Sequence, residues 1–478
     1  MPAFEYAPAP ESTSIVDIRS SYGLFIGGSF VEPVDGGRFK TVNPATEDVL
    51  AEVVSAGPSD VDAAVAAARQ AYERTWRDLP GRDRAKYLYR IARLLQERAR
   101  EFAVLESIDN GKPIRESRDV DVPLAAAHFF YYAGWADKLA HAGFGADPRP
   151  LGVAGQVIPW NFPLLMLAWK IAPALACGNT VVLKPAETTP LTALLFAEVC
   201  QQADLPPGVV NIVTGAGETG RCLVTHPGVD KVAFTGSTEV GREIAKSAAG
   251  TPKRLTLELG GKAANIVFED APLDQAVEGI VNGIFFNQGH VCCAGSRLLV
   301  QESVADALLS ALKRRMARLR VGDPLDKNTD IGAINSAAQL ARIRELSEAG
   351  DAEGAQRWSP PCVLPDRGFW FAPTIFTGVS QAHRIAREEI FGPVLSVLTF
   401  RTPAEAVEKA NNTPYGLSAG VWTEKGSRIL AMADQLRAGV VWANTFNKFD
   451  PTAPFGGYKE SGYGREGGRH GLEAYLAH

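Results

Sequence analysis

Short runs of β-branched residues alternate with helical patterns between residues 181 and 260. The runs are VVLKP (181–185), VVNIVTG (209–215), KVAFTGS (231–237) and RLTLELG (254–260), and the helical patterns cover 191–204 and 240–250. Strands that alternate with helices predict an α/β fold with a parallel sheet covered by helices on both faces. Sheets of this kind bind ligands beyond the carboxyl ends of their strands, where glycine-rich turns lead into helices. We therefore expect a binding site at that edge.

The alternation restarts after Glu258. The run AANIVFED is followed by a helical pattern from about Leu273 and then by RLLVQES, which predicts a second α/β lobe. Upstream, helical patterns cover residues 59–76 and 83–108, and residues 1–22 are expected to form a loose polar lead-in. A chain of 478 residues has room for roughly three domain-sized units.

Charge and hydropathy exclude several classes of protein. The net charge is -5 and no long basic run occurs, so neither nucleic acid nor an anionic membrane is an expected partner. The most apolar stretch, residues 152–177, is interrupted by Gln156, Asn161, Lys170 and prolines, which predicts buried core rather than a membrane span. The N-terminus lacks the pattern of a secretory signal. The six cysteines fit neither a disulfide framework nor a zinc spacing, so we expect free thiols, no metal site and a cytoplasmic location.

Two strand ends carry residues suited to a dinucleotide. In FTGSTEVG (234–241), small residues stand between a predicted strand and a predicted helix, so backbone N–H groups can approach a pyrophosphate. In LKPAE, Lys184 and Glu187 follow another strand, and a carboxylate there can accept both ribose hydroxyls. FTGSTEVG could instead be a plain turn, and Lys184 and Glu187 could instead be a solvated ion pair. These residues alone do not decide between the interpretations.

Three other stretches could carry chemistry. Glu258 precedes two glycines in LELGGK, and a buried carboxylate has a raised pKa that suits a general base. Asn161 lies on the stiff backbone of VIPWNFP, where its amide can act as a fixed donor. Glu258 could instead be an ordinary surface glutamate, and VIPWNFP could instead be a structural turn. In NQGHVCCAGSR, either Cys292 or Cys293 could be a nucleophile, because the local sequence does not choose between them.

Eight short motifs follow one another along the chain between residues 157 and 468. They are VIPWNFPLLMLAWK, GNTVVLKPAE, PPGVVNIVTG, VAFTGSTEVGR, LELGGK, NQGHVCCAGSR, EEIFGPV and PFGGYKESGYGREGG. In this order and spacing they resemble the NAD(P)-dependent aldehyde dehydrogenase superfamily over nearly the whole chain. The resemblance implies an aldehyde dehydrogenase fold, with a Rossmann-like cofactor domain, an α/β catalytic domain and an oligomerisation arm. It also implies oxidation of an aldehyde to a carboxylic acid with NAD, through a thiohemiacetal, hydride transfer and thioester hydrolysis.

The resemblance implies a role for each candidate residue. Cys292 is the nucleophile, and Cys293 is its buried neighbour. The amide of Asn161 and the backbone N–H of Cys292 form an oxyanion hole, while Glu258 activates water beside Lys170 as a supporting cation. The expected cofactor contacts are Ile158, Pro159, Trp160, Lys184, Glu187, Gly217, Phe234, Gly236, Ser237, Leu259, Glu389 and Phe391. The expected lining of the aldehyde tunnel is Phe162, Trp169, His290, Val291 and Phe455.

The resemblance also implies a division of the chain. The NAD-binding domain comprises residues 1–126 and 150–258, the catalytic domain residues 259–460, and a shortened arm and tail residues 127–149 and 461–478. The lead-in YAPAPES and the ending ESGYGREGGRHGLEAYL are similar to the first, active half of a two-copy subfamily.

Several positions depart from the family pattern. His290 stands where glutamine is usual, and Ala263-Ala264 replaces Ser-Pro. The arm sequence AHAGFGADPRPLG is short and lacks the alternation of a ladder strand, and the terminal GLEAYLAH is expected to be helix or coil. We therefore expect a homodimer, or pairing with a homologous aldehyde dehydrogenase subunit, in place of the usual tetramer.

Two other functions compete with aldehyde oxidation. A non-catalytic scaffold or partner subunit need keep none of Cys292, Glu258 and Asn161, and all three are present. A CoA-acylating enzyme typically lacks a carboxylate at the position of Glu258.

The position of Glu187 predicts a cofactor preference. A carboxylate that faces the ribose 2′-hydroxyl repels the 2′-phosphate of NADP and loses its donor. We expect a lower Michaelis constant for NAD than for NADP at moderate ionic strength, measured by steady-state kinetics with each cofactor. Equal efficiency with both cofactors would mean that Glu187 does not reach the ribose.

Overall fold

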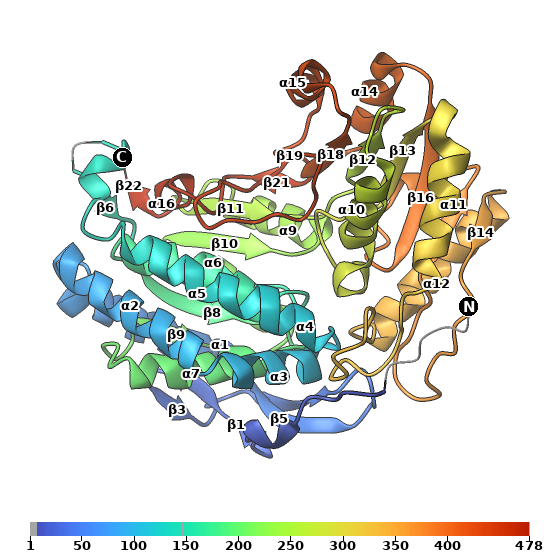
Figure 1. Ribbon diagram of the computed structural model, residues 1–478. Helices are drawn as coiled ribbons and strands as arrows, with labels where there is room; N and C mark the ends of the chain where they lie inside the picture. Colours follow the sequence, from blue (N-terminus) through green and yellow to red (C-terminus); the bar gives the residue numbers. More distant parts are fainter. Residues whose placement is uncertain (1–6, 146, 478) are drawn as a thin grey trace.

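The strands of the first lobe form an eight-stranded sheet in the order β21-β11-β10-β7-β8-β9-β2-β3 (Figure 1). The structure is a computed structural model that describes residues 7–145 and 147–477. The five central strands are β7 (Val153–Val157), β8 (Thr180–Lys184), β9 (Val210–Ile212), β10 (Lys231–Thr235) and β11 (Arg254–Glu258). They pair in parallel, which confirms the expected sheet. Antiparallel strands close both edges: β2 (Leu24–Ile26), β3 (Ser29–Val31) and β21 (Gly462–Tyr463).

Helices cover both faces of this sheet because successive side chains of a strand point to opposite sides. Val182 packs with α1 (Pro58–Ala71), α8 (Gly217–Thr225) and α9 (Thr238–Ala248) on one face. Val181 and Leu183 pack with α6 (Pro163–Ala176) and α7 (Leu191–Gln202) on the other. Every residue of α6 is buried, as expected for a core segment. In the described part of the chain, no helix has the length and hydropathy needed to cross a membrane.

The second lobe contains a seven-stranded sheet in the order β14-β15-β16-β13-β12-β18-β19. Its strands are β14 (Gln356–Trp358), β15 (Thr374–Thr377), β16 (Val394–Phe400), β13 (Arg297–Gln301), β12 (Ala264–Val267), β18 (Ser418–Trp422) and β19 (Val440–Ala443). Its main helices are α10 (Leu273–Phe285), α11 (Ala305–Met316), α12 (Ala337–Ala352), α14 (Pro403–Asn411) and α15 (Gly426–Gln435). The predicted strand–helix–strand unit after Glu258 is therefore confirmed as β12, α10 and β13.

The N-terminal region differs from expectation in two places. The helix expected over residues 83–108 is broken into α2 (Gly81–Glu97) and α3 (Ala99–Asn110), because Arg98 leaves the helical region of backbone space. The lead-in is not loose over its described part: β1 (Ser21–Tyr22) pairs with β5 (Val49–Ser55), and Glu11 forms ion pairs with Arg100 and Lys327. Residues 1–6 of the lead-in lie outside the described residues.

The arm and tail also form a ladder that the sequence did not predict. Two residues of the arm, β6 (Arg149–Pro150), pair antiparallel with the tail strand β22 (Leu476–Ala477), which follows α16 (His470–Glu473). Pro150 has no backbone N–H to donate, so the pairing is confined to a very short ladder. The expectation of helix or coil throughout the tail was therefore wrong for these two residues.

Candidate active site

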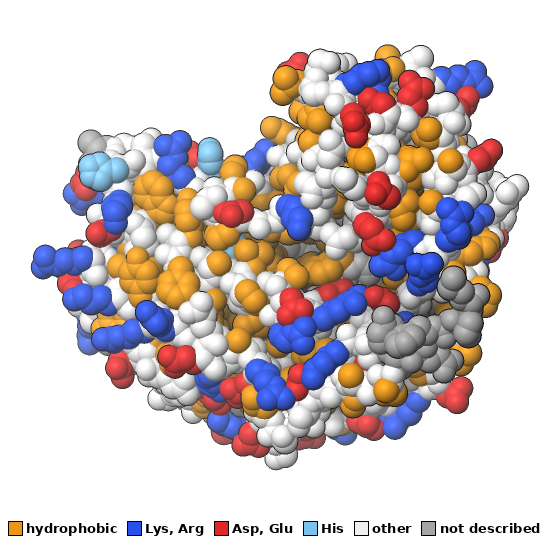
Figure 2. All heavy atoms as spheres, viewed as in Figure 1, with side chains coloured by type: hydrophobic (Ala, Val, Ile, Leu, Met, Phe, Trp, Pro, Cys, Tyr) orange, Lys and Arg blue, Asp and Glu red, His pale blue; other side chains and the backbone are white. Residues whose placement is uncertain are grey.

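A cavity of about 390 Å³ lies where the carboxyl ends of β10 and β11 meet the second lobe. Figure 2 shows hydrophobic side chains gathered between the two lobes on the face in view. Fourteen of the expected site residues line the cavity: Pro159, Trp160, Asn161, Phe162, Trp169, Gly236, Ser237, Glu258, Leu259, Val291, Cys292, Glu389, Phe391 and Phe455. These residues are separated widely in sequence and are brought together by the fold.

The chain reverses sharply after α10 to form the loop that carries the cysteines. Asn287, Gln288 and Gly289 all have left-handed backbone angles, with φ of 47°, 52° and 76°. A Cβ at Gly289 would lie 2.1 Å from the carbonyl oxygen of Gly392, so this position accepts only glycine. The side chain of Gln288 donates to Ala333 O and accepts from Gly332 N, which fixes the turn. The reversal places Cys292 in the cavity wall.

The two cysteines differ in their surroundings. Cys293 is 1% exposed and its Sγ donates to Asn447 Oδ1 at 3.7 Å, whereas Cys292 is partly exposed to the cavity. The neighbouring Cys292 thiol and burial raise the pKa of the Cys293 thiol well above its usual range. The thiolate is the nucleophilic form of cysteine, so Cys293 is the inert member of the pair. Cys292 and Cys293 are both free thiols, as expected.

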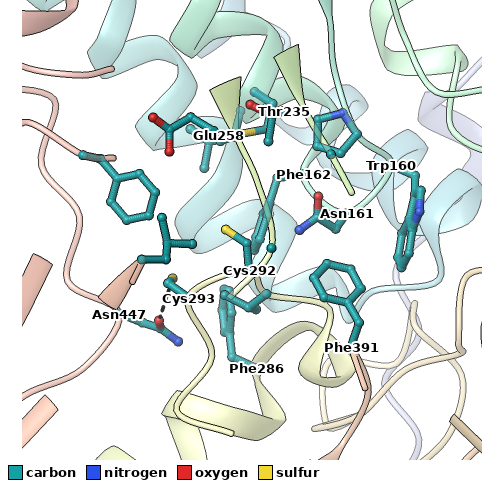
Figure 3. Close-up of a pocket in the computed structure, with 18 of the residues that line it drawn as sticks. Trp160, Asn161, Phe162, Thr235, Glu258, Phe286, Cys292, Cys293, Phe391 and Asn447 are labelled. Carbon is teal, nitrogen blue, oxygen red and sulfur yellow. Dashed lines mark hydrogen bonds between the residues drawn. The ribbon is translucent and has the colours of Figure 1, made fainter. Parts of the chain in front are cut away.

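Asn161 is fixed by a reciprocal contact with the cysteine loop. Its Nδ2 donates to His290 O at 2.8 Å, and Asn287 Nδ2 donates to Asn161 O at 2.7 Å. One amide hydrogen is used in this way, and the second is free to serve a ligand in the cavity. In Figure 3 the Sγ of Cys292 lies between the Asn161 amide and the Glu258 carboxyl group.

Glu258 ends β11 and is 4% exposed, and neither of its carboxyl oxygens has a partner among the described residues. Burial and the charge of Glu466 raise the pKa of Glu258 well above its usual range, while Lys170 opposes the shift. Lys170 does not line the cavity; it is fully buried and pairs with Glu466. Lys170 is thus paired with a carboxylate that sequence reasoning missed, and its charge lowers the pKa of Glu258. A glutamate in the glycine-rich run GREGG gave no signal of burial.

The cavity is lined by a second buried carboxyl group, that of Glu389. Gly261 N donates to Glu389 Oε1 at 3.0 Å, and a Cβ at Gly260 would lie 2.3 Å from Glu389 Oε2. Burial raises the pKa of Glu389 to about 7 against the effects of that donor and of Lys262. The two glycines thus form a cradle that a side chain would fill. Only one oxygen of Glu389 is engaged in this cradle, which suits a carboxylate that accepts from a ribose.

The expected pyrophosphate contacts lie at the starts of two helices. Ser237 caps α9 by accepting from Val240 N at 3.3 Å, and a Cβ at Gly236 would lie 2.5 Å from the ring of Phe234, which packs in the core. Gly217 begins α8, and a Cβ there would meet no atom within 4 Å. These small residues leave backbone N–H groups accessible to an anion, so they fit a dinucleotide.

Other expected cofactor residues lie outside the lining of the cavity. Ile158 is buried and donates its backbone N–H to Lys184 O, which ties the ends of β7 and β8 together. Lys184 is buried, and its Nζ lies 3.5 Å from Glu187 Oε2. The Glu187 side chain is 49% exposed and accessible from solvent. The two residues adjoin the first lobe's strand ends, beyond the main cavity.

The expected tunnel residues are all brought to the cavity except one. Phe162, Trp169, Val291 and Phe455 line it, whereas His290 is fully buried behind the wall. Sequence reasoning missed further lining residues: Leu124, Leu165, Met166, Phe286, Phe449, Gln339 and Arg342. Leu165 and Met166 lie within the motif VIPWNFPLLMLAWK, and the others lie outside the eight motifs. Apolar helix residues are usually core, so their type alone gave no signal of a lining role.

Comparisons with known proteins all match this chain to aldehyde dehydrogenases. The sequence profile of the aldehyde dehydrogenase family matches residues 30–478. An aldehyde dehydrogenase from Alternaria alternata is 47% identical over 464 residues, which cover 95% of this chain and 93% of that protein. Human retinal dehydrogenase 2 is 44% identical over 478 residues, which cover 98% of this chain and 92% of that protein. The structure of an aldehyde dehydrogenase from Bacillus cereus in complex with NAD+ superposes with a TM-score of 0.92 at 43% identity, covering 96% of each chain.

The contrast between the two cysteines can be tested by alkylation. Limited reaction with iodoacetamide at neutral pH should label Cys292 before Cys293, because Cys293 is buried and held in the thiol form. Peptide mass mapping locates the label. Cys293→Ala should keep the fast label and Cys292→Ala should lose it; faster labelling of Cys293 would overturn the contrast.

Proposed function

The chain belongs to the aldehyde dehydrogenase family, and on this premise we propose that Cys292 is the nucleophile of an NAD-dependent oxidation of an aldehyde to a carboxylic acid. The observation that carries the proposal is the arrangement around the sulfur. Cys292 lies in an apolar cavity between a fixed amide donor, Asn161, and the unpartnered carboxyl group of Glu258. A nucleophile, an oxyanion donor and a base are thus within one site.

The first step is attack by the Cys292 thiolate on the aldehyde carbon. The developing negative charge on the aldehyde oxygen is stabilised by the free Asn161 amide hydrogen and by the backbone N–H of Cys292. Because Asn161 is already held by His290 O and Asn287 Nδ2, it needs no reorganisation when the charge develops. Loss of one such donor typically costs about 10²–10³ in rate.

The proposed cofactor contacts lie at the strand ends of the first lobe and, for Glu389 and Phe391, in the second lobe before β16. Lys184 and Glu187 hold the adenosine ribose, Gly217, Gly236 and Ser237 adjoin the pyrophosphate, and Glu389 accepts from the nicotinamide ribose. The remaining contacts are Ile158, Pro159, Trp160, Phe234, Leu259 and Phe391. When bound, NAD supplies the acceptor for the hydride that leaves the thiohemiacetal. The cradle formed by Gly260 and Gly261 supports this assignment because it holds Glu389 by one oxygen only.

The last step is hydrolysis of the thioester that remains on Cys292. Glu258 takes a proton from water, and the resulting hydroxide attacks the acyl carbon. The raised pKa of Glu258 makes its carboxylate a stronger base than an exposed glutamate. Glu466 raises that pKa and Lys170 lowers it, which supports the role of Lys170 as a supporting cation that acts by its charge.

The alternative is a non-catalytic scaffold or partner subunit. A scaffold requires no convergence of Cys292, Asn161 and Glu258 on one cavity, and this convergence favours the enzyme. The aldehyde enters along Phe162, Trp169, Val291 and Phe455, which are apolar and favour an apolar substrate.

The division of the chain and its location are further proposals. The boundaries proposed are residues 1–126 and 150–258 for the NAD-binding domain, 259–460 for the catalytic domain, and 127–149 with 461–478 for the arm and tail. The two large sheets, which change at about residue 260, support the first boundary. Six free thiols support a reducing cytoplasm.

Deacylation gives the direct test of the proposed function. Glu258→Gln should lower turnover by about 10²–10⁴ because it removes the general base. A thioester should then accumulate on Cys292, detected by intact-mass analysis after mixing with an aldehyde and NAD. The same variant with Cys292→Ala should show no adduct, and with Cys293→Ala it should show the full adduct. Full turnover by Glu258→Gln, without an adduct, would mean that Glu258 is not the base.

Assembly is a separate proposal. We propose that the chain forms a homodimer, or pairs with a homologous aldehyde dehydrogenase subunit, as the resemblance to the active half of a two-copy subfamily suggests. The two-residue ladder between β6 and β22 supports this, because it offers little backbone for a sheet that continues across a tetramer.

Light scattering of the purified chain at several concentrations tests the assembly. A homodimer mass, or a monomer mass that doubles when a homologous subunit is added, is expected. A stable homotetramer would contradict the proposal.

A further inference from the structure

His290 lies behind the wall of the cavity, in contact with two rings that form the wall. Its ring meets Trp160 edge-on at 4.8 Å between centroids and lies nearly parallel to Phe391 at 5.9 Å. Trp160 and Phe391 contact each other edge-on at 5.3 Å. We call Trp160, His290 and Phe391 the three-ring cluster. Its members come from three separate loops. The rings of Trp160 and Phe391 line the cavity side by side (Figure 3).

The backbone of His290 belongs to the same junction. Its carbonyl oxygen accepts from Asn161 Nδ2 at 2.8 Å, and Asn161 directly follows Trp160 in the chain. The preceding residue, Gly289, lies against the backbone of Gly392, which directly follows Phe391. The cysteine loop therefore contacts the oxyanion segment and the Phe391 segment through consecutive residues.

Phe391 depends on its neighbours for its conformation. Its φ of 55° is in the left-handed region, which a bulky side chain rarely adopts. Gln339 Nε2 donates to Phe391 O at 2.9 Å and holds the backbone. On the side-chain face, the aromatic rings in contact with it are those of Trp160 and His290. Removal of one ring leaves a strained backbone with less packing to maintain it.

The His290 ring acts by its shape rather than by its charge. It is fully buried, and neither ring nitrogen has a partner among the described residues. Burial, aided by the charge of Lys112, lowers the pKa of His290 to about 3, so the ring is neutral at physiological pH. Two unpaired nitrogens add no favourable contact, so the ring contributes through the packing of its planar faces and edges.

We propose that His290 is a positioning residue whose ring holds Phe391 and Trp160 in the arrangement that shapes the cofactor end of the cavity. The inference rests on the proposed function, in which Phe391 and Trp160 contact NAD. It replaces the expectation that His290 lines the aldehyde tunnel. Truncation of this ring should therefore weaken NAD binding and leave aldehyde binding unchanged.

The test measures NAD affinity without turnover. Isothermal titration of NAD into Cys292→Ala protein gives the reference dissociation constant. Adding His290→Ala should raise it by about tenfold, since the stacking of an aromatic pair contributes on that order. His290→Phe should restore it to within about twofold, because the planar ring returns. If His290→Ala is not recovered as folded protein, His290→Leu, which fills the volume without a planar ring, replaces it with the same expectation.

His128 provides a matched control. It is also a buried histidine, its pKa is likewise lowered to about 3, and its ring lies 5.0 Å from Trp169 on the aldehyde side. His128→Ala should leave the dissociation constant of NAD unchanged. In protein that retains Cys292, His290→Ala should raise the Michaelis constant of NAD and leave that of the aldehyde within about twofold.

Each outcome has a defined meaning. Unchanged NAD affinity in His290→Ala, equal weakening by His128→Ala, or failure of His290→Phe to restore affinity overturns the inference alone. Absence of NAD binding by the Cys292→Ala reference overturns the proposed function, and this inference with it.

Discussion

The site depends on the register of three parallel strands. In the first lobe, Phe234 of β10 pairs with Val157 of β7 and with Leu257 of β11, so the three strands end at the same level. Glu258 is the last residue of β11, Ser237 follows β10, and Asn161 follows β7. A slip of one residue in this pairing would turn Glu258 to the opposite face of the sheet and would shift the loops that carry Ser237 and Asn161. Glu258, Ser237 and Asn161 therefore share one edge because hydrogen bonds between the strands align the strand ends.

The site also depends on the carboxyl group of Glu258, which is buried and has no hydrogen-bond partner among the described residues. A buried, unpartnered carboxyl group is costly, and the pKa of Glu258 is raised in consequence. The same raised pKa makes the Glu258 carboxylate a stronger base than that of an exposed glutamate, as the proposed function requires. Lys170 and Glu466, which pair with each other nearby, offset one another's charge and so leave Glu258 without a salt bridge of its own. The apolar wall supplied by residues such as Phe455 maintains the low polarity on which this depends.

The cysteine loop contacts both lobes through its backbone, and these contacts fix the relative positions of the segments that form the site. Gly289 approaches Gly392 more closely than any side chain would allow, and the adjacent His290 meets Asn161 through its carbonyl group. The loop thus fixes Cys292, Asn161 and Phe391 relative to one another. The three-ring cluster extends the same contact to the cofactor end of the cavity, where packing rather than hydrogen bonding holds the side chains.

Local sequence patterns were sufficient to predict several elements of the first lobe. The alternating runs predicted β8, β10 and β11 and the helices between them, since burial of a strand on both faces requires continuous apolar residues. The order of the motifs identified Cys292, Glu258 and Asn161 as candidates. Tertiary structure decided the rest: the partner of Lys170 is 296 residues away in Glu466, the tail strand β22 pairs with β6, and His290 turns behind the cavity wall. These features have no local signature, because each depends on contacts between segments that only the folded chain brings together.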